Sequence, residues 1–105
     1  MNKLTLKENQ KEIIPFELLE GEKRLDVILA GENAQVEIIG LVLGKLDEQK
    51  SLEAYITHAA PNTKSNVNVR VVLRGKAKFD FRGNVKIEKG AKGADAYLRS
   101  DALLF

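Results

Sequence analysis

This sequence of 105 residues contains no cysteine and no tryptophan, one methionine, two prolines and one histidine. Without cysteine the chain cannot form disulfides, nor supply thiolate ligands to zinc or to an iron–sulfur cluster. One imidazole is too few for the usual zinc and non-haem iron sites. Composition leaves a carboxylate site for magnesium or calcium open, but no EF-hand spacing or paired-aspartate motif indicates one. We therefore expect this chain alone to bind no metal and no cofactor.

Long hydrophobic runs are also missing. No apolar run approaches the roughly 20 residues needed to cross a bilayer, and the first ten residues, MNKLTLKENQ, lack the apolar segment of a secretory signal. We therefore expect a cytoplasmic protein with no membrane contact. The length, with 44% apolar and 30% charged residues, suits one ordinary folded domain spanning residues 1–105.

The net charge of +2 hides an asymmetry along the chain. Residues 1–60 hold 7 Lys/Arg and 11 Asp/Glu, whereas residues 61–105 hold 10 and 4. This pattern fits solvated faces, and it also fits docking of an acidic end against a basic end. We do not expect nucleic-acid binding, because Phe79 and Phe81 alternate out of phase with the charges and fit a core better than a base-stacking surface.

Alternation of apolar and polar residues predicts a series of short strands separated by turns rich in glycine, proline and asparagine. We expect no helix beyond a short piece near Phe16–Leu25, and a short edge strand within Leu4–Phe16. Residues 1–24 could cap one end of the domain. Turn spacing predicts an all-β fold, but a sandwich, a barrel and a solenoid fit it equally well. The expected strands are Leu25–Leu29, Val36–Gly44 with a bend or bulge at Gly40, Leu52–His58, Val67–Leu73, Phe79–Ile87 with an interruption at Gly83, and Ala94–Phe105.

A series of short motifs in the second half of the chain is informative as a set. In chain order they are His58, Pro61–Ser65, the strand Val67–Leu73 with Gly75, Phe81-Arg82-Gly83, Gly90-Ala91, Ala94–Ala96 and Asp101–Leu104. In this order and at these gaps, they resemble the core of the SufB/SufD family of iron–sulfur cluster assembly proteins, over about Leu25 to Phe105. The resemblance implies a right-handed parallel β-helix, a single-stranded solenoid with two flattened parallel sheets. For this chain we predict about four or five coils.

The same resemblance implies a function. Family members act as scaffolds on which iron–sulfur clusters are built, together with an ABC-type ATPase. Their ATPase-binding helical region and the coils with cysteine, histidine and acidic cluster residues have no counterpart in these 105 residues. Where cluster-building members can carry a thiol near the closing strand, this chain has Arg99 and Ser100. An iron–sulfur cluster is thus implied only through partners.

We therefore predict a minimal SufB/SufD-like scaffold or adaptor that acts through protein–protein contacts and is not an enzyme. The alternative is a non-catalytic structural self-assembly module that keeps the fold without the pathway. Expected partners are a second copy of the chain, a SufB/SufD-type protein, or the ABC-type ATPase subunit of the SUF complex.

His58 is the weak functional candidate. As a general base it would need a nucleophile and an orienting group, and Thr63, Ser65 and Asp80 could lie near it in a coil. We expect a structural histidine that caps a corner. The glycine-bearing segments Gly40–Gly44 and Lys89–Gly93 lack the ending of a phosphate loop.

Two surfaces are candidates for docking. Arg70, Arg74, Lys76 and Lys78 predict a basic docking face, with Arg70 and Arg74 outward on the same strand face. Leu103, Leu104 and Phe105 predict an apolar end that is buried against another copy or a partner.

Overall fold

The computed structural model describes residues 2–18 and 21–104, and the regular secondary structure within these ranges is entirely β-strand. The strands are β1 (Asn2–Leu6), β2 (Lys11–Leu18), β3 (Glu22–Leu29), β4 (Gln35–Gly44), β5 (Gln49–His58), β6 (Lys64–Leu73), β7 (Lys78–Ile87) and β8 (Asp95–Leu104). Accordingly, no helix that could span a membrane occurs in the described part of the chain.

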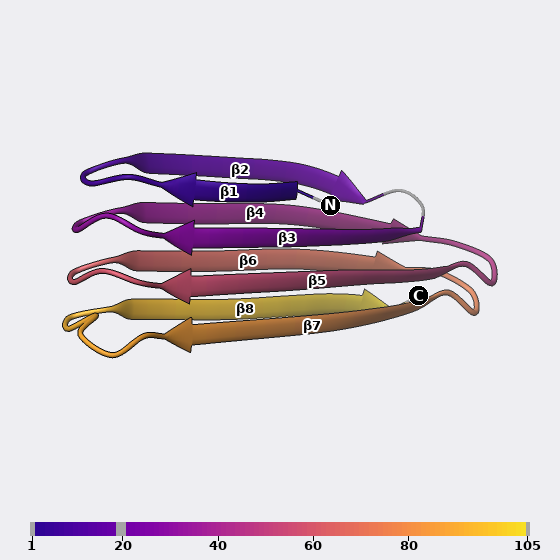
Figure 1. Cartoon of the computed structure of the whole chain (residues 1–105). Coiled ribbons are helices and arrows are strands. Elements are labelled where there is room, and N and C mark those ends of the chain that lie inside the picture. The colour runs from indigo at the N-terminus through magenta and orange to yellow at the C-terminus, as the bar shows by residue number, and fades with distance from the viewer. Residues whose placement is uncertain (1, 19–20, 105) are drawn as a thin grey trace.

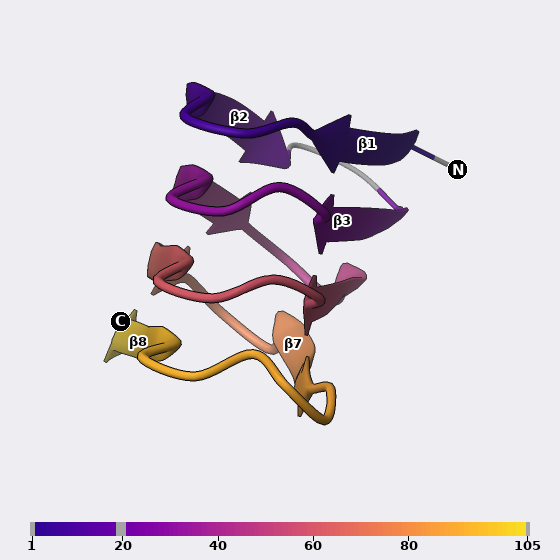
Figure 2. The same ribbon diagram turned by 60° about the vertical axis from the view of Figure 1, so that its left-hand side comes forward.

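The strands form two four-stranded sheets that face each other (Figure 1). Sheet A has the order β1-β3-β5-β7 and sheet B the order β2-β4-β6-β8, and every pairing is parallel. Each coil gives one strand to sheet A and one to sheet B, so the chain winds through four coils. Figures 1 and 2 show that the winding is right-handed. The predicted parallel β-helix is confirmed, and the sandwich and barrel alternatives are wrong.

Successive coils are similar in length. Gln35 pairs with Lys64, and Lys64 pairs in turn with Asp95, so these coils take about 30 residues, within the range of solenoid repeats, whereas Lys11 pairs with Gln35 and the first coil takes about 24. Side chains alternate between the interior and the outer face of each sheet, and the register stacks apolar residues in columns such as Ile38 on Val67. The core lies between the two sheets, and it buries Leu25, Val27, Leu29, Val36, Ile38, Val42, Leu52, Ile56, Val67, Val69 and Val71.

The strands predicted from Leu25 onward are confirmed within the described residues, but the predicted interruption at Gly83 is wrong, because Gly83 pairs with Ala54 in the regular part of β7. The predictions for the first 24 residues are not confirmed. The single edge strand within Leu4–Phe16 is wrong, because β1 and β2 are separate strands that pair with β3 and β4 and form the first coil. The short helix near Phe16–Leu25 is also wrong where the structure describes it: Phe16 lies in β2 and Leu25 in β3. Residues 19 and 20 lie outside the described residues. A capping role for residues 1–24 stays a prediction.

At one corner of the solenoid, each coil has a residue in the left-handed backbone conformation, and these residues stack on one another. Asn9, Asn33, Asn62 and Gly93 have φ values of 60°, 65°, 58° and 74°. Asparagine and glycine tolerate this region best. The Asn33 side-chain amide donates to Asn9 Oδ1 at 3.1 Å, so the turns of the first two coils are joined directly.

Gly40 belongs to the regular part of β4, where it pairs with Phe16 and Val69, and the predicted bend or bulge is wrong. A Cβ atom at Gly40 would overlap the ring of Phe16. The missing side chain therefore makes room for this aromatic ring, which packs against the core from the first coil.

Candidate functional site

His58 ends β5 with its side chain turned into the interior, where it is 0% exposed. Its Nδ1 lies 2.8 Å from Thr63 Oγ1, and its Nε2 lies 2.9 Å from Ser65 Oγ. Thr63 belongs to the turn after β5, and Ser65 is the second residue of β6. The imidazole therefore joins sheet A to sheet B across the corner.

The hydroxyl protons settle the direction of this chain of hydrogen bonds. Thr63 Oγ1 donates to the carbonyl oxygen of Ala60 at 3.1 Å, so its single proton is used. Nδ1 of the neutral imidazole must then carry the proton that is donated to Thr63, and Nε2 accepts from the Ser65 hydroxyl. No buried side-chain nitrogen or oxygen among the described residues lacks a partner.

A serine beside an imidazole is the arrangement of an activated nucleophile, but the surroundings oppose that use. Ser65 is only 4% exposed, so a substrate cannot reach its hydroxyl in this conformation. The group on Nδ1 is a threonine hydroxyl, which cannot balance the charge of an imidazolium as a carboxylate does. The predicted proximity of Thr63 and Ser65 is confirmed. That of Asp80 is wrong, because Asp80 is exposed on the outer face of sheet A and pairs with Arg82 at 3.6 Å.

Burial lowers the pKa of His58 below its ordinary value of 6.5, against the opposing effects of the Asp95 charge and of the Thr63 backbone. Well above pH 6.5 the imidazole is neutral in both the folded and the unfolded chain. As pH falls below 6.5, the unfolded chain binds a proton that the folded chain resists. The free energy of unfolding should therefore fall until the pH passes below the pKa of the folded state.

We expect the urea midpoint to be lower at about pH 5 than at about pH 7.5, and this difference to shrink in His58→Leu. Carboxylates also titrate in this range, so the comparison between the two proteins isolates the imidazole. An equal pH dependence in both proteins would show that His58 does not resist protonation in the folded state.

The predicted basic face is divided among three surfaces. Arg70 points outward from β6 in sheet B, Arg74 and Lys76 lie in the following turn, and Lys78 opens β7 in sheet A. All four side chains are exposed. The expectation that Arg70 and Arg74 share a strand face is wrong, because β6 ends at Leu73. A docking role for these residues stays a prediction.

The predicted apolar end is also divided. Leu104 is 75% exposed and continues the interior column below Leu73, whereas Leu103 is 61% exposed and continues the outer column below Val72. Phe105 lies outside the described residues. Ile87 and Leu98 belong to the same open end as Leu104, because they continue the interior columns of His58 and Val67 and no further coil among the described residues covers them.

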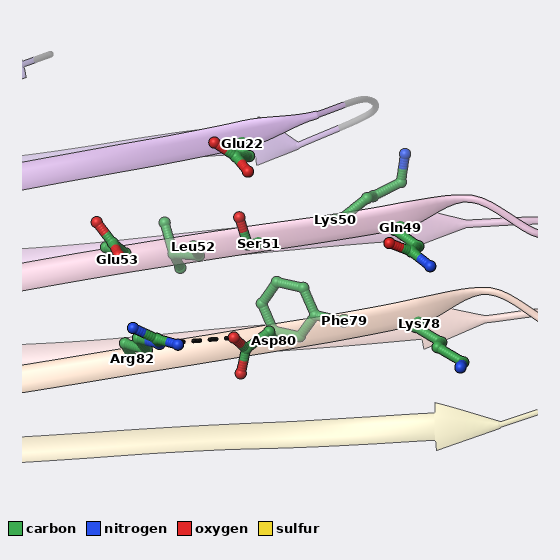
Figure 3. Close-up of a pocket in the computed structure, with 10 residues that line it drawn as sticks. All are labelled: Glu22, Gln49, Lys50, Ser51, Leu52, Glu53, Lys78, Phe79, Asp80 and Arg82. Carbon is green, nitrogen blue, oxygen red and sulfur yellow. Dashed lines mark ion pairs between the residues drawn. The ribbon is translucent and has the colours of Figure 1, made fainter.

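A hollow of about 560 Å³ lies on the outside of sheet A (Figure 3). Its charged side chains have both signs, and Asp80 and Arg82 neutralise each other there. Lys50, whose side chain is buried, has its Nζ 3.7 Å from Glu48 Oε1. Within residues 2–18 and 21–104 there is no group of three or more His, Cys, Asp or Glu that could hold a metal. This hollow therefore has no feature of a built ligand site.

A second hollow, of about 930 Å³, crosses the outside of sheet B and is lined by residues of all four strands. Sequence reasoning missed this surface. The sequence signal for this surface is a pair of consecutive apolar residues in one strand. Side chains alternate along a strand, so one member of each pair points to the outer face of the sheet. Ile38 is buried while Ile39 is 46% exposed, and Val42 is buried while Leu43 is 41% exposed.

Comparison with known proteins assigns the chain to a family. The family model described as the SUF system FeS cluster assembly SufBD core domain matches residues 21–105. An iron–sulfur cluster assembly SufBD family protein of Mycobacterium bovis is 36% identical over 78 residues, which are 74% of this chain and 9% of that protein.

Two further relatives agree. A SufBD family protein of Porphyra purpurea is 32% identical over 77 residues, 73% of this chain and 16% of that protein. The iron–sulfur cluster assembly protein SufB of Bacillus subtilis is 29% identical over 77 residues, 73% of this chain and 17% of that protein. No solved structure matches the chain. The chain thus spans less than a fifth of the length of each of these relatives, and it belongs to the SufBD family of iron–sulfur cluster assembly proteins.

Proposed function

We propose that this chain is a scaffold or adaptor in iron–sulfur cluster assembly that acts through protein–protein contacts at the open end of its solenoid. The observation that carries the proposal is the exposure of interior columns at β7 and β8. Ile87, Leu98 and Leu104 are 54%, 40% and 75% exposed, although the residues above them in each column are buried.

The backbone supports the same use of this end. β7 and β8 each have one neighbouring strand, so each leaves one edge of backbone N–H and C=O groups without a strand beside it among the described residues. Such edges pair readily with a strand of another chain. A partner strand would bury the apolar columns and satisfy these groups together.

The cluster in this proposal is cargo and is held with the help of partners. The chain has no thiol, and both nitrogens of its single imidazole are engaged with Thr63 and Ser65 in the interior. We propose a SufB/SufD-type protein as the partner at the open end, and the ABC-type ATPase as a further member of the same complex.

The experiment is capture of purified SufB/SufD-type protein and ATPase from the same organism by the immobilised chain. Leu104→Asp and Ile87→Asp place a charge in the apolar columns, so we expect each to weaken capture by about tenfold or more, because an unpaired charge is costly to bury. Circular dichroism and the melting temperature would show that the variants remain folded.

Leu46→Asp is the matched control, since Leu46 is 72% exposed but lies in the turn between β4 and β5. It should leave capture unchanged. If the unsubstituted chain captures neither protein, the proposal is overturned. Assembly of the chain with itself but not with these proteins would favour the alternative of a structural self-assembly module.

A further inference from the structure

The two ends of the solenoid differ in their interior side chains. At the β1/β2 end, two interior positions carry a charge: Glu12 continues the column of Val36, and Lys23 continues the column of Leu52. At the β7/β8 end, the interior positions are all uncharged. They are Phe79, Phe81, Gly83, Val85 and Ile87 on β7, and Ala96, Leu98, Ser100, Ala102 and Leu104 on β8.

The short first strand leaves Lys23 uncovered. β1 begins at Asn2, which pairs with Leu25, so no strand among the described residues lies beside Lys23 on its N-terminal side. The Lys23 ammonium group stands over the ring of Phe16, with Nζ 5.4 Å from the centroid. The same ring occupies the space that a side chain at Gly40 would fill. An aromatic ring and a cation thus close the interior at this end.

A further strand on this end would bury both charges. Neither Glu12 nor Lys23 forms an ion pair with any of the described residues. Each is the second residue of its strand, and β2 and β3 run in opposite directions, so the two charges lie at opposite ends of the coil and do not neutralise each other (Figure 1). Burial of unpaired charges is costly, and inward-pointing charges protect sheet edges for this reason.

Pro15 removes a backbone donor from the same end. In sheet B, the N–H groups of Gln35, Lys64 and Asp95 donate to the preceding coil at 2.9, 3.0 and 2.9 Å. Successive residues direct their backbone groups to opposite sides of a strand, so Ile39 has the same direction as Gln35. Ile39 pairs with Pro15. The Pro15 nitrogen therefore faces the free edge of β2, where it donates nothing and its ring obstructs a neighbouring strand.

The free edges of β7 and β8 have no such interruption. The N–H groups of Lys78 and Asp95, the first residues of these strands, donate to the preceding coil at 2.9 Å in both cases. The residues that direct their backbone groups to the free edge are therefore the interior ones, and none of them is proline. This end offers a complete row of donors and acceptors.

We propose that the first coil is a cap that excludes a further strand, so that strands of other chains add only at the β7/β8 end and copies of this chain do not stack head to tail. A head-to-tail contact of this kind does not close, and it generates filaments. The cap therefore keeps every complex of this protein finite, with one strand-accepting end on each chain.

The outer faces alone would not prevent such stacking. If the columns continued from one copy to the next, β2 of the following copy would lie beside β8, which places Lys11 beside Asp95. Glu17 would lie beside Asp101, whose charge is already neutralised by Arg99 at 3.0 Å. The obstacles are therefore the two interior charges and the proline. The inference is independent of the proposed function, because it concerns the opposite end of the solenoid and does not depend on which partner is captured.

Removing the cap should turn a finite particle into a growing filament. Glu12→Val, Pro15→Val and Lys23→Leu together remove both charges and restore the missing donor. We expect the weight-average mass of this uncapped variant, measured by light scattering at about 100 µM, to exceed that of the unsubstituted chain by about tenfold or more. Ile87→Asp in the uncapped variant should abolish growth, because it places a charge at the β7/β8 end of each contact.

A variant with Glu12→Val and Lys23→Leu alone isolates the proline. It should stack with about tenfold weaker affinity than the uncapped variant, because each contact then lacks one hydrogen bond. Glu53→Val with Lys64→Leu is the matched control, since it adds similar apolar groups to the outer faces of the third coil, and it should stay as small as the unsubstituted chain.

Circular dichroism would show that all variants are folded. Unlimited growth of the unsubstituted chain would overturn the inference, and so would a folded uncapped variant that stays small or growth that Ile87→Asp leaves unchanged. Failure to capture a SufB/SufD-type protein would count against the proposed function alone.

Discussion

Replacing His58 with leucine should lower the free energy of unfolding by about 2–4 kcal/mol, because it leaves the buried Ser65 hydroxyl without a partner and removes the donor to Thr63 Oγ1. Leucine fills most of the space of the imidazole but neither donates nor accepts a hydrogen bond. Ser65 then loses its acceptor in the interior, while Thr63 keeps its bond to the carbonyl of Ala60. Urea unfolding at about pH 7.5, where the imidazole is neutral, measures the effect.

A second substitution separates the cost of the unsatisfied Ser65 hydroxyl from the cost of changed packing. In His58→Leu, the further change Ser65→Ala removes the unsatisfied hydroxyl, so the double variant should regain about 1 kcal/mol or more. Thr57→Ala, one residue earlier and on the outer face of β5, should change stability by less than about 0.5 kcal/mol. If His58→Leu were as stable as the unsubstituted chain, the hydrogen-bonded corner would have no structural role.

Gly31→Ala should detach the first coil. A Cβ atom at Gly31 would overlap the backbone of Lys7 and Glu8, in the turn of the preceding coil. This backbone cannot yield as a flexible side chain would, because the Gly31 and Ala30 N–H groups both donate to the Leu6 carbonyl, at 3.2 and 3.0 Å. Gly31→Ala should therefore destabilise the pairing of β1 and β2 with the rest of the solenoid by about 3 kcal/mol.

Hydrogen exchange measures this loss strand by strand. Protection of amides in β1 and β2 should fall by about 100-fold, whereas amides of β6, two coils away, should keep most of their protection. Gly21→Ala is the control, since nothing lies within 4 Å of a Cβ atom there and only its φ of +74° opposes a side chain. That change should cost about 1 kcal/mol. A uniform loss of protection across all coils in Gly31→Ala would contradict a local detachment.

The fold could be predicted well wherever alternation is bounded by distinctive turns. The strand Val67–Leu73 lies between Pro61-Asn62-Thr63 and Gly75, and the structure places it within β6. The first coil could not be predicted in this way, because the turn between β1 and β2 contains neither glycine nor proline. Asn9 alone adopts the left-handed conformation there, and a single asparagine is a weak signal.

The candidate site could be predicted only in part. The neighbourhood of His58, Thr63 and Ser65 follows from a short turn, but their burial depends on the phase of alternation across that turn. The outer face of sheet B was missed for a related reason. A pair such as Ile38-Ile39 is compatible with a strand that has a single apolar face. Both residues of such a pair are normally buried only where the sheet is covered on both sides.

The register has a further consequence for variation in this chain. A side chain in β4 touches one in β6 about 30 positions later, and that one touches a third in β8 at nearly the same stride. Epistasis should therefore follow the columns, so that a change at Val67 is compensated at Ile38 or Leu98 sooner than at its neighbours in sequence.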